Sequence, residues 1–345
     1  MPRRAVIALV VLALAIAACR GPGEPSTCPT PPPSGVGYCG FTPMSLKVGL
    51  GYIPSVQFAQ FYLAQQAGYY RDAGLEVTFE NKIDPDLVTL VGQGALDIGV
   101  ADGTSVVPAV SQGIPIKYIT TMYGTYPSIV FAKASSGITS AADLEGKKIG
   151  IPGKYGSSWI MLQALLSSAD LTPDDVTIVE YPDFGQGVAV QADAVDAATG
   201  FANNEPVQLE LSGTKAVVLH VDDIVPLPGP GLIVGQAALD AKHDAIAEFQ
   251  NATLRAMEEI AADPSKGLDA AIAAVPELAS DRATQEAILE ATIATWAPPG
   301  GGPADFGAID RAGWEATVDL LVTLGIVSNP PSLDRLVEEI GVMPT

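Results

Sequence analysis

The sequence predicts an α/β protein made of two doubly wound lobes, with a hinge and a ligand cleft between them. Short apolar segments alternate with helical patterns from about residue 46 to residue 221, as expected for mostly parallel sheets covered by helices. The alternation falls into two successive series, and about 300 residues beyond the N-terminal leader are enough for two lobes. Such a pair of lobes can close around a ligand by hinge bending.

The first series begins with a predicted strand at residues 46–50, followed by Ser55 as a helix N-cap. Phe58, Phe61 and Tyr62 then repeat with helical spacing, which indicates a buried helix face. The later elements of this series are predicted strands at residues 75–79, 96–100 and 114–122, with helices around 87–91 and 106–110. The alternation of strands and helices predicts the first lobe.

The second series predicts the other lobe. Ser140 to Asp143 is typical of a capping box, a helix is expected from about Trp159, and Thr172 is expected to cap a further helix. The predicted strands are residues 129–132, 148–151, 176–179, 197–200 and 216–221. We therefore assign residues 44–127 and 228–345 to lobe I and residues 128–227 to lobe II.

The tail from about Asp240 is almost wholly helical and rich in alanine. It is too long to form the edge of one lobe, so we expect it to wrap back onto lobe I. Trp296 and Trp314 lie in this tail and are candidates either for the cleft or for the core.

Residues 1–18 predict a signal peptide. Arg3 and Arg4 precede an apolar run of about 14 residues, shorter than the roughly 20 that span a bilayer. The run ends in Ile-Ala-Ala-Cys at Cys19, which resembles the bacterial lipobox. The resemblance implies cleavage before Cys19 and a lipid on its sulfur, with enough acyl chains for stable anchoring. Ordinary cleavage beside an incidental cysteine is the alternative.

Residues 19–43 predict a lipid-anchored tether. The segment is rich in Pro, Gly, Ser and Thr, a composition typical of a semi-rigid spacer. Cys28 and Cys39 lie within it, and export permits a disulfide between them without requiring one. Because both cysteines lie outside the predicted lobes, we expect neither a metal site nor a catalytic nucleophile there.

The charge balance limits the partners. The chain carries 18 Lys and Arg against 39 Asp and Glu, a net charge of −21, which argues against nucleic acid and anionic membrane surfaces. Signals for catalysis are weak: His220 and His243 show no Ser-His-Asp spacing, and no GxSxG, HExxH or CxxC motif occurs. We expect no enzymatic activity, no cofactor and no metal.

Candidate binding residues gather at predicted strand ends, where open α/β sheets bind ligands. Aromatic residues with amides or hydroxyls recur at residues 51–57, 101–105, 153–159 and 200–206, and again at 123–127. Each segment alone is compatible with a helix cap or a core aromatic, but their recurrence favours a site for a flat, neutral heterocycle. The candidates are Tyr52, Gln57, Asp102, Thr104, Tyr123, Tyr126, Tyr155, Ser157, Asn203, Asn204 and Glu205.

Several segments, taken together, resemble the sulfonate, nitrate and thiamine-pyrimidine group of ABC importer binding proteins. They are LGYIPSVQFAQFY at residues 50–62, AGYY at 67–70, GLEV at 74–77, GALDIGV at 94–100, QGIPI at 112–116 and DLEGKKIG at 143–150. The resemblance spans roughly residues 44–260. It implies a type II periplasmic binding protein fold whose first lobe is built from both ends of the chain.

The ligand stays open within that group. IPGKYGSS at residues 151–158 and ANNEPVQ at 202–208 are similar to the branch assigned to riboflavin or to thiamine-type pyrimidines. Sulfonate, taurine and nitrate binders must satisfy an anion, and these are the alternative here, although the candidate loops carry Asp102 and Glu205 and only Lys154 as a cation. Fungal pyrimidine synthases share the fold, but their Cys-rich motif and sacrificial histidine are not legible.

The vitamin interpretation assigns roles to the candidates. Asp102 and Glu205 would accept hydrogen bonds from ring N–H groups, and aromatic side chains would stack on the ring faces. The stacking residues would be Tyr52, Tyr123 and Tyr155, and the edge contacts would come from Gln57, Ser157 and Asn203. An exported enzyme of the same fold and a surface lipoprotein with an empty cleft are the rival classes.

The resemblance also implies partners and a location. The ligand would be a flavin or an aminopyrimidine, handed to the permease and ATPase subunits of an importer. The chain would be a monomer, attached to the extracytoplasmic face of the membrane, in the periplasm or at the cell surface, through the lipid on Cys19.

Overall fold

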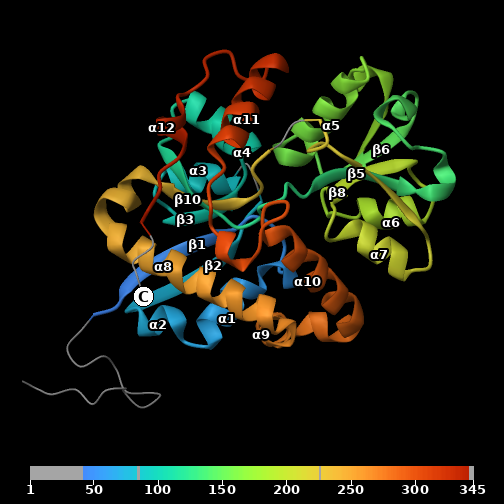
Figure 1. Ribbon diagram of the computed structural model, residues 1–345. Helices are drawn as coiled ribbons and strands as arrows, with labels where there is room; N and C mark the ends of the chain where they lie inside the picture. Colours follow the sequence, from blue (N-terminus) through green and yellow to red (C-terminus); the bar gives the residue numbers. More distant parts are fainter. Residues whose placement is uncertain (1–41, 84–85, 225–226, 342–345) are drawn as a thin grey trace, which may run out of the picture. The chain divides into compact units, whose positions relative to one another are not determined.

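The computed structural model of the chain describes residues 42–83, 86–224 and 227–341 (Figure 1). The predicted signal peptide, Cys19, Cys28, Cys39 and all but the last two residues of the predicted tether lie outside these ranges. The described residues from Pro43 onward belong to one compact unit.

Ten strands of the described chain form two five-stranded mixed sheets. The first sheet has the order β2-β1-β3-β10-β4, in which β10 runs antiparallel to both of its neighbours. Its strands are β1 (Met44–Leu50), β2 (Leu75–Asn81), β3 (Ile98–Ala101), β4 (Ile116–Thr121) and β10 (Gly231–Gly235). β1 pairs in parallel register with β2 on one side and β3 on the other.

The second sheet repeats the same plan, with the order β7-β6-β8-β5-β9 and β5 as the antiparallel strand. Its strands are β5 (Ser128–Lys133), β6 (Lys148–Ile151), β7 (Thr177–Glu180), β8 (Ala197–Phe201) and β9 (Ala216–His220). The antiparallel strand β5 is the first strand of the second series, whereas the antiparallel strand β10 of the first sheet follows the whole second series in the sequence. The expectation of two α/β lobes is confirmed.

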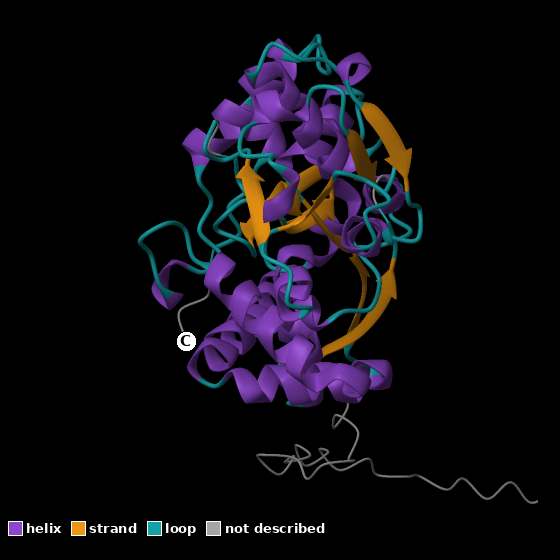
Figure 2. Cartoon of the chain, turned by 90° about the vertical axis from the view of Figure 1, so that its right-hand side faces the viewer, coloured by secondary structure: helices purple, strands orange, loops and turns teal. Residues whose placement is uncertain are grey.

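Helices cover both faces of the first sheet (Figure 1). One layer consists of α1 (Ala59–Gln66), α2 (Tyr69–Asp72), α8 (Gln236–Ala262), α9 (Pro264–Ala274) and α10 (Arg282–Trp296). The other layer consists of α3 (Asp86–Gly92), α4 (Gly103–Ser111), α11 (Arg311–Thr323) and α12 (Leu333–Leu336). The C-terminal helices therefore pack on the first sheet, as their alanine-rich pattern predicted, and Figure 2 shows strands lying between helical layers.

The second sheet is also covered on both faces, by α5 (Gly156–Ser168) on one side and by α6 (Gln186–Gln191) with α7 (Glu205–Leu211) on the other. Short 3₁₀ helices complete the chain at Val56–Phe58, Ala134–Ser136, Ala141–Leu144, Pro173–Asp175, Pro276–Asp281 and Pro303–Asp305. Ser55 caps the first of these by accepting a hydrogen bond from the backbone N–H of Gln57, at 3.3 Å.

Three sequence predictions need correction. Strand β10 was missed, because its three central apolar residues are too few to show a period and glycines flank them. Helix α5 begins at Gly156 rather than near Trp159. Thr172 and Asp175 do form a capping box, but the turn between them stays a single 3₁₀ turn instead of a helix.

The buried hydrophobic residues of the described chain form four clusters, each packed between a sheet and the helices on one of its faces. Trp296 and Trp314 are both fully buried and belong to the two clusters of the first lobe. Trp314 packs edge-on against Tyr118 with ring centroids 4.7 Å apart, and Trp296 packs edge-on against Phe306 with ring centroids 5.9 Å apart, so both tryptophans are core residues. Among the described helices, none combines the length and the apolar character that a membrane crossing requires.

The chain passes between the sheets twice, after β4 and before β10, and these two segments lie side by side. The backbone N–H groups of Met122 and Tyr123 both donate to the carbonyl oxygen of Pro230, at 3.1 and 3.0 Å. Gly229 permits this approach, because a Cβ there would lie 2.2 Å from the carbonyl oxygen of Tyr123. The two crossing segments are therefore joined to each other by backbone hydrogen bonds.

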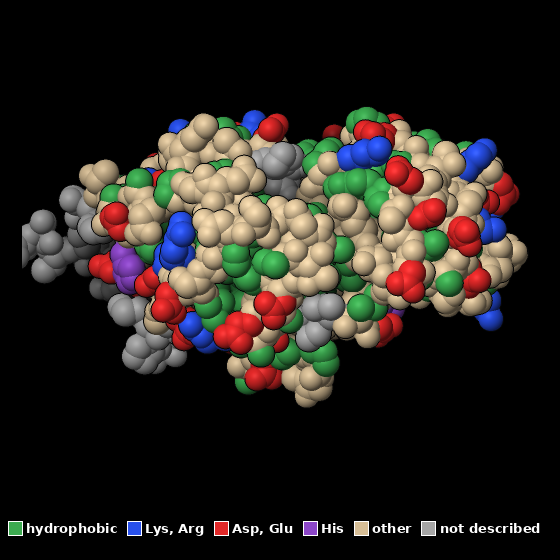
Figure 3. Space-filling model, turned by 90° about the horizontal axis from the view of Figure 1, so that it is seen from above, with side chains coloured by type: hydrophobic (Ala, Val, Ile, Leu, Met, Phe, Trp, Pro, Cys, Tyr) green, Lys and Arg blue, Asp and Glu red, His purple; other side chains and the backbone are tan. Residues whose placement is uncertain are grey.

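Charged side chains on the face shown in Figure 3 are scattered over the described surface, without a broad basic area. This distribution agrees with the acidic composition of the chain. It offers no footprint for a polyanion on that face.

Candidate functional site

A cavity of about 140 Å³ lies between the two sheets. Four of the loops that line it follow parallel strands, namely β1, β3, β6 and β8, and so stand at the carboxyl ends of those strands. Each of these loops leads into the first turn of a helix, where polar residues are favoured as caps. The lining residues from these loops include Tyr52, Gln57, Asp102, Ser105, Tyr155, Ser157, Ser158, Phe201, Asn204 and Glu205.

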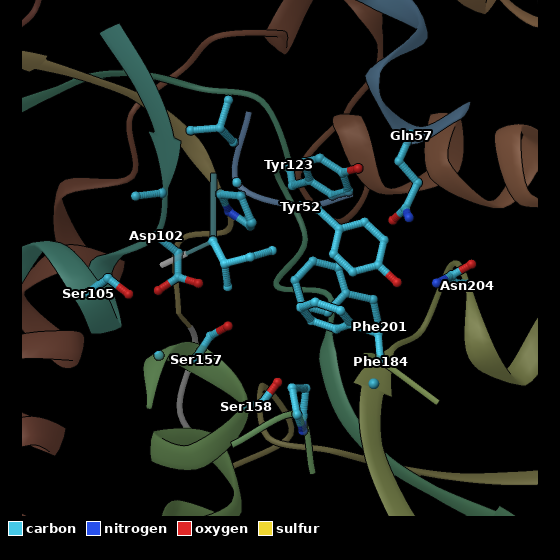
Figure 4. A pocket seen from close by; sticks show the side chains of 18 of the residues that line it. Tyr52, Gln57, Asp102, Ser105, Tyr123, Ser157, Ser158, Phe184, Phe201 and Asn204 are labelled. Atoms are coloured by element: carbon cyan, nitrogen blue, oxygen red, sulfur yellow. The ribbon is translucent and has the colours of Figure 1, made fainter. Parts of the chain in front are cut away.

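Aromatic rings form one wall of this cavity (Figure 4). The ring of Tyr52, from the first lobe, meets the ring of Phe184, from the second lobe, edge-on with centroids 4.8 Å apart. Phe201 and Tyr123 stand beside this pair. Burial raises the pKa of the Tyr52 hydroxyl, and a hydrogen bond with the side chain of Asn204 opposes that rise. The wall thus combines ring surfaces with polar tips, which suits a flat heterocycle.

Phe184 adopts an unusual backbone conformation, with φ at +60°. A left-handed conformation is strained for a bulky aromatic residue, and such strain is concentrated at functional sites. The backbone N–H of Phe184 donates to the carbonyl oxygen of Tyr181 at 2.9 Å and closes a tight turn. This turn places the Phe184 ring in the cavity lining.

Asp102 is the buried carboxyl on the side of the first lobe. Its Oδ1 atom caps helix α4 by accepting from the backbone N–H of Thr104 at 2.9 Å and from the Thr104 hydroxyl at 2.5 Å. Burial raises the pKa of Asp102, while hydrogen bonds from Thr104, from the backbone of Ser105 and from Ser157 of the opposite lobe act against that rise. Figure 4 shows Ser157 facing the carboxyl group across the cavity.

Glu205 is the buried carboxyl on the side of the second lobe. Its Oε2 atom accepts a hydrogen bond of 2.8 Å from the backbone N–H of Phe201, and Gln186 Nε2 lies 3.5 Å from Oε1. Burial raises the pKa of Glu205 from 4.5 to about 7. Glu205 therefore stands near its titration midpoint at neutral pH, where it can donate as well as accept a hydrogen bond.

Eight of the eleven predicted site residues line the cavity. They are Tyr52, Gln57, Asp102, Tyr123, Tyr155, Ser157, Asn204 and Glu205. The other three lie nearby without lining it: Thr104 supports Asp102, Tyr126 is buried in the core of the second lobe, and Asn203 bonds to the first lobe instead. Asn203 and Asn204 are neighbours in sequence, yet their side chains serve different contacts.

Seven lining residues lie outside the strand-end segments that the sequence indicated: Phe58, Ile83, Val100, Pro152, Phe184, Gln186 and Pro230. Phe184 and Gln186 follow strand β7, which runs parallel to β6. The carboxyl end of β7 was not among the strand ends predicted to contribute to the site. The turn sequence Asp183-Phe184-Gly185 after a predicted strand was the available signal. Ile83 follows β2 and has an aliphatic side chain, which a search for aromatic, amide and hydroxyl residues at strand ends does not find.

Within residues 42–83, 86–224 and 227–341, no histidine, cysteine or lysine lines this cavity. His220 lies on β9 and His243 on α8, and Lys154 extends over the ring of Trp159, 5.6 Å from its centroid. Within the described residues, no group of three or more His, Cys, Asp or Glu is arranged to hold a metal ion.

The two lobes and the cavity between them define the periplasmic binding protein fold. The periplasmic aliphatic sulphonate-binding protein SsuA from Escherichia coli shares it, with a TM-score of 0.67 at 16% identity over 85% of this chain and 97% of that one. Residues 55–267 match the family described as NMT1/THI5 like. The chain belongs to this family.

Two relatives show the range of proteins that resemble this chain. The riboflavin-binding protein RibY from Chloroflexus aurantiacus is 31% identical over 332 residues, covering 94% of each protein. The 4-amino-5-hydroxymethyl-2-methylpyrimidine phosphate synthase from Legionella pneumophila is 32% identical over 168 residues, covering 48% of this chain and 52% of that protein. The similarity to RibY therefore extends over both lobes, and that to the synthase over about half the chain.

Proposed function

We propose that this chain is an exported solute-binding protein that captures riboflavin or a closely related flavin between its two lobes. The observation that carries the proposal is the combination, in one cavity, of an aromatic wall with buried hydrogen-bonding groups from both lobes. A flavin ring offers two flat faces to the aromatic residues and donors and acceptors to Asp102, Asn204 and Glu205. The similarity to RibY over nearly the whole chain supports the same ligand.

The electrostatics disfavour a sulfonate or nitrate ligand. Asp102 and Glu205 are the carboxyl groups among the described lining residues, and no lysine, arginine or histidine among those residues offsets them. An anion would therefore be desolvated beside acidic groups without a cationic partner. A neutral ring avoids this cost and allows both carboxyls to form hydrogen bonds.

A thiamine-type pyrimidine is the second candidate, favoured by the similarity to the Legionella pyrimidine phosphate synthase. An aminopyrimidine carries the same kinds of edge donors and acceptors as a flavin but has a single ring. The two candidates differ in size, so a direct comparison of affinities separates them.

We further propose that the chain binds its ligand without converting it. Histidine, cysteine and lysine supply many side-chain nucleophiles and bases, and none of them is found among the described residues that line the cavity. Incubation of riboflavin or an aminopyrimidine with the purified protein should return the compound unchanged by mass spectrometry. A new product formed in proportion to protein would support the enzyme alternative.

The sequence before the described residues supports a lipid-anchored binding protein of an ABC importer. A Cys19→Ser variant should lose its fatty-acid label and leave the membrane fraction, whereas a Cys28→Ser variant should keep both. Co-purification with a permease and its ATPase from the native host would support delivery to an importer.

The ligand is tested by titrating the purified protein, without residues 1–19, against riboflavin, an aminopyrimidine, taurine and nitrate. Riboflavin fluorescence should be quenched on binding to the aromatic wall, and thermal stability should rise by roughly 2.7 kcal/mol at 100 times the dissociation constant. Stabilisation by taurine or nitrate alone would contradict the proposal. Stabilisation by the aminopyrimidine alone would establish the second candidate.

A further inference from the structure

A second hollow of about 360 Å³ opens directly beside the cavity. The two hollows share Ser105, Tyr155 and Gly156 among their lining residues, so they adjoin along these residues. The second hollow runs between helices α3 and α4 of the first lobe and helix α5 of the second. We call it the side groove.

The side groove is lined by uncharged residues throughout. Hydroxyl and amide groups come from Thr89, Ser105, Gln112 and Gln163, and they alternate with aliphatic side chains and the ring of Trp159. This lining differs from the cavity, which has buried carboxyl groups and a wall of aromatic rings. Uncharged donors and acceptors on an otherwise apolar surface suit a neutral chain that carries several hydroxyl groups.

The side groove also leads outward. Thr89 and Gln112 are exposed, whereas Gln163 and Tyr155 are half-buried. A molecule whose ring occupies the cavity could therefore extend a flexible substituent past Ser105 and Tyr155 toward solvent. The substituent would pass polar side chains from both lobes on its way.

We propose that the side groove binds a neutral polyhydroxylated chain attached to the ring, so that the protein selects a ring with a polyol tail over the bare ring. The inference rests on the proposed function, because the ring must first occupy the cavity. Riboflavin, with its ribityl chain, has this composition. Lumiflavin carries the same ring with a methyl group in place of that chain.

The test compares riboflavin with lumiflavin on three proteins: the wild type, the double variant Gln112→Ala/Gln163→Ala, and the control Gln191→Ala. Gln191 is an exposed glutamine of α6 that lines neither hollow. The wild type should bind riboflavin at least tenfold more tightly than lumiflavin. The double variant should weaken riboflavin binding roughly three- to tenfold, as expected for lost neutral hydrogen bonds, and leave lumiflavin binding unchanged. The control should bind both as the wild type does.

Equal affinities of the wild type for riboflavin and lumiflavin would overturn the inference while leaving flavin binding in place. An equal loss for both ligands in the double variant would do the same, because the glutamines would then act on the ring or the fold. Tighter binding of flavin mononucleotide than of riboflavin would show that a charged tail is preferred, against a neutral one. Binding of neither flavin would remove the proposed function, and this inference with it.

Discussion

The side-chain amide of Asn203 donates a hydrogen bond of 2.9 Å to Oε1 of Gln57, and this bond joins the two lobes. Asn203 follows strand β8 of the second sheet, whereas Gln57 belongs to the 3₁₀ turn after β1 of the first. The same amide also lies 2.8 Å from the hydroxyl of Thr292 on helix α10. All three side chains are buried, so the contact is shielded from competing water.

Replacing Asn203 with alanine should weaken ligand binding although its side chain does not line the cavity. The change leaves the buried Gln57 oxygen without this donor, at a cost of about 1–3 kcal/mol to the arrangement in which the lobes meet. Affinity measured by calorimetry should fall about 5- to 100-fold. The Thr292→Val variant removes only one partner and should show a smaller loss. Wild-type affinity in Asn203→Ala would show that the bond has no part in closure.

Phe184 should show opposite effects on stability and on binding. Phe184→Gly removes the cost of the left-handed backbone, roughly 1–2 kcal/mol, whereas Phe184→Ala keeps that cost. The glycine variant should therefore have the higher free energy of unfolding of the two in urea titrations. Both variants lose the ring that meets Tyr52, so both should lose affinity to a similar extent. Equal stabilities would argue that the turn relaxes when the ring is removed.

Glu205 should make the protein less stable as the pH rises from about 4.5 through 7. Its pKa is raised to about 7 in the folded chain, so between these values the folded state keeps a proton that the unfolded state releases. The stabilisation is fully present below pH 4.5 and is lost above 7, and its size is on the order of 3 kcal/mol. The Glu205→Gln variant should lack this part of the pH dependence in chemical denaturation.

The difference between wild type and Glu205→Gln reports Glu205 specifically. The pKa values of Asp102 and His220 are also raised, so these groups contribute a pH dependence of the same sign in both proteins. Parallel stability curves for the two proteins between pH 5 and 8 would show that Glu205 does not titrate in this range.

Asp102 should have separable effects on the fold and on the ligand. Asp102→Ala removes the N-cap of α4 and should cost about 1 kcal/mol, whereas Asp102→Asn keeps a capping side chain. Both variants should bind riboflavin less tightly, with the larger loss for alanine. Asp263 provides a matched control, because it caps α9 through the same pair of contacts with Ser265 and does not line the cavity. Asp263→Ala should lose similar stability and keep full affinity.

The sequence predicted structure best where a residue pattern is compatible with only one local conformation. Phe58, Phe61 and Tyr62 repeat at helical spacing and are all buried, as predicted. The caps at Ser55 and at Ser140 with Asp143 also form as predicted. Strand ends were found because glycine, hydroxyl and amide residues follow short apolar runs there. Those patterns were enough to predict the fold class and most of the residues that line the cavity.

Other features depend on contacts that no local pattern encodes. Tyr126 and Tyr123 are close in sequence, yet one enters the core of the second lobe and the other lines the cavity. Asn203 pairs with residues 146 and 89 positions away, so its role follows from the docking of the lobes. Phe184 was missed because its backbone conformation is one that its residue type disfavours.

The position of strand β10 in the sequence also determines the order in which the two lobes can fold during synthesis. This strand separates β3 from β4, and β4 pairs with it from Thr121 across to Gly231, about 110 residues later in the chain. The second sheet, by contrast, draws all five strands from residues 128–220. As the ribosome releases the chain, the second lobe can therefore finish while the first still lacks its antiparallel strand. Strands β1, β2 and β3 can pair with one another beforehand, but β4 can join them only after β10, which is made after the second lobe.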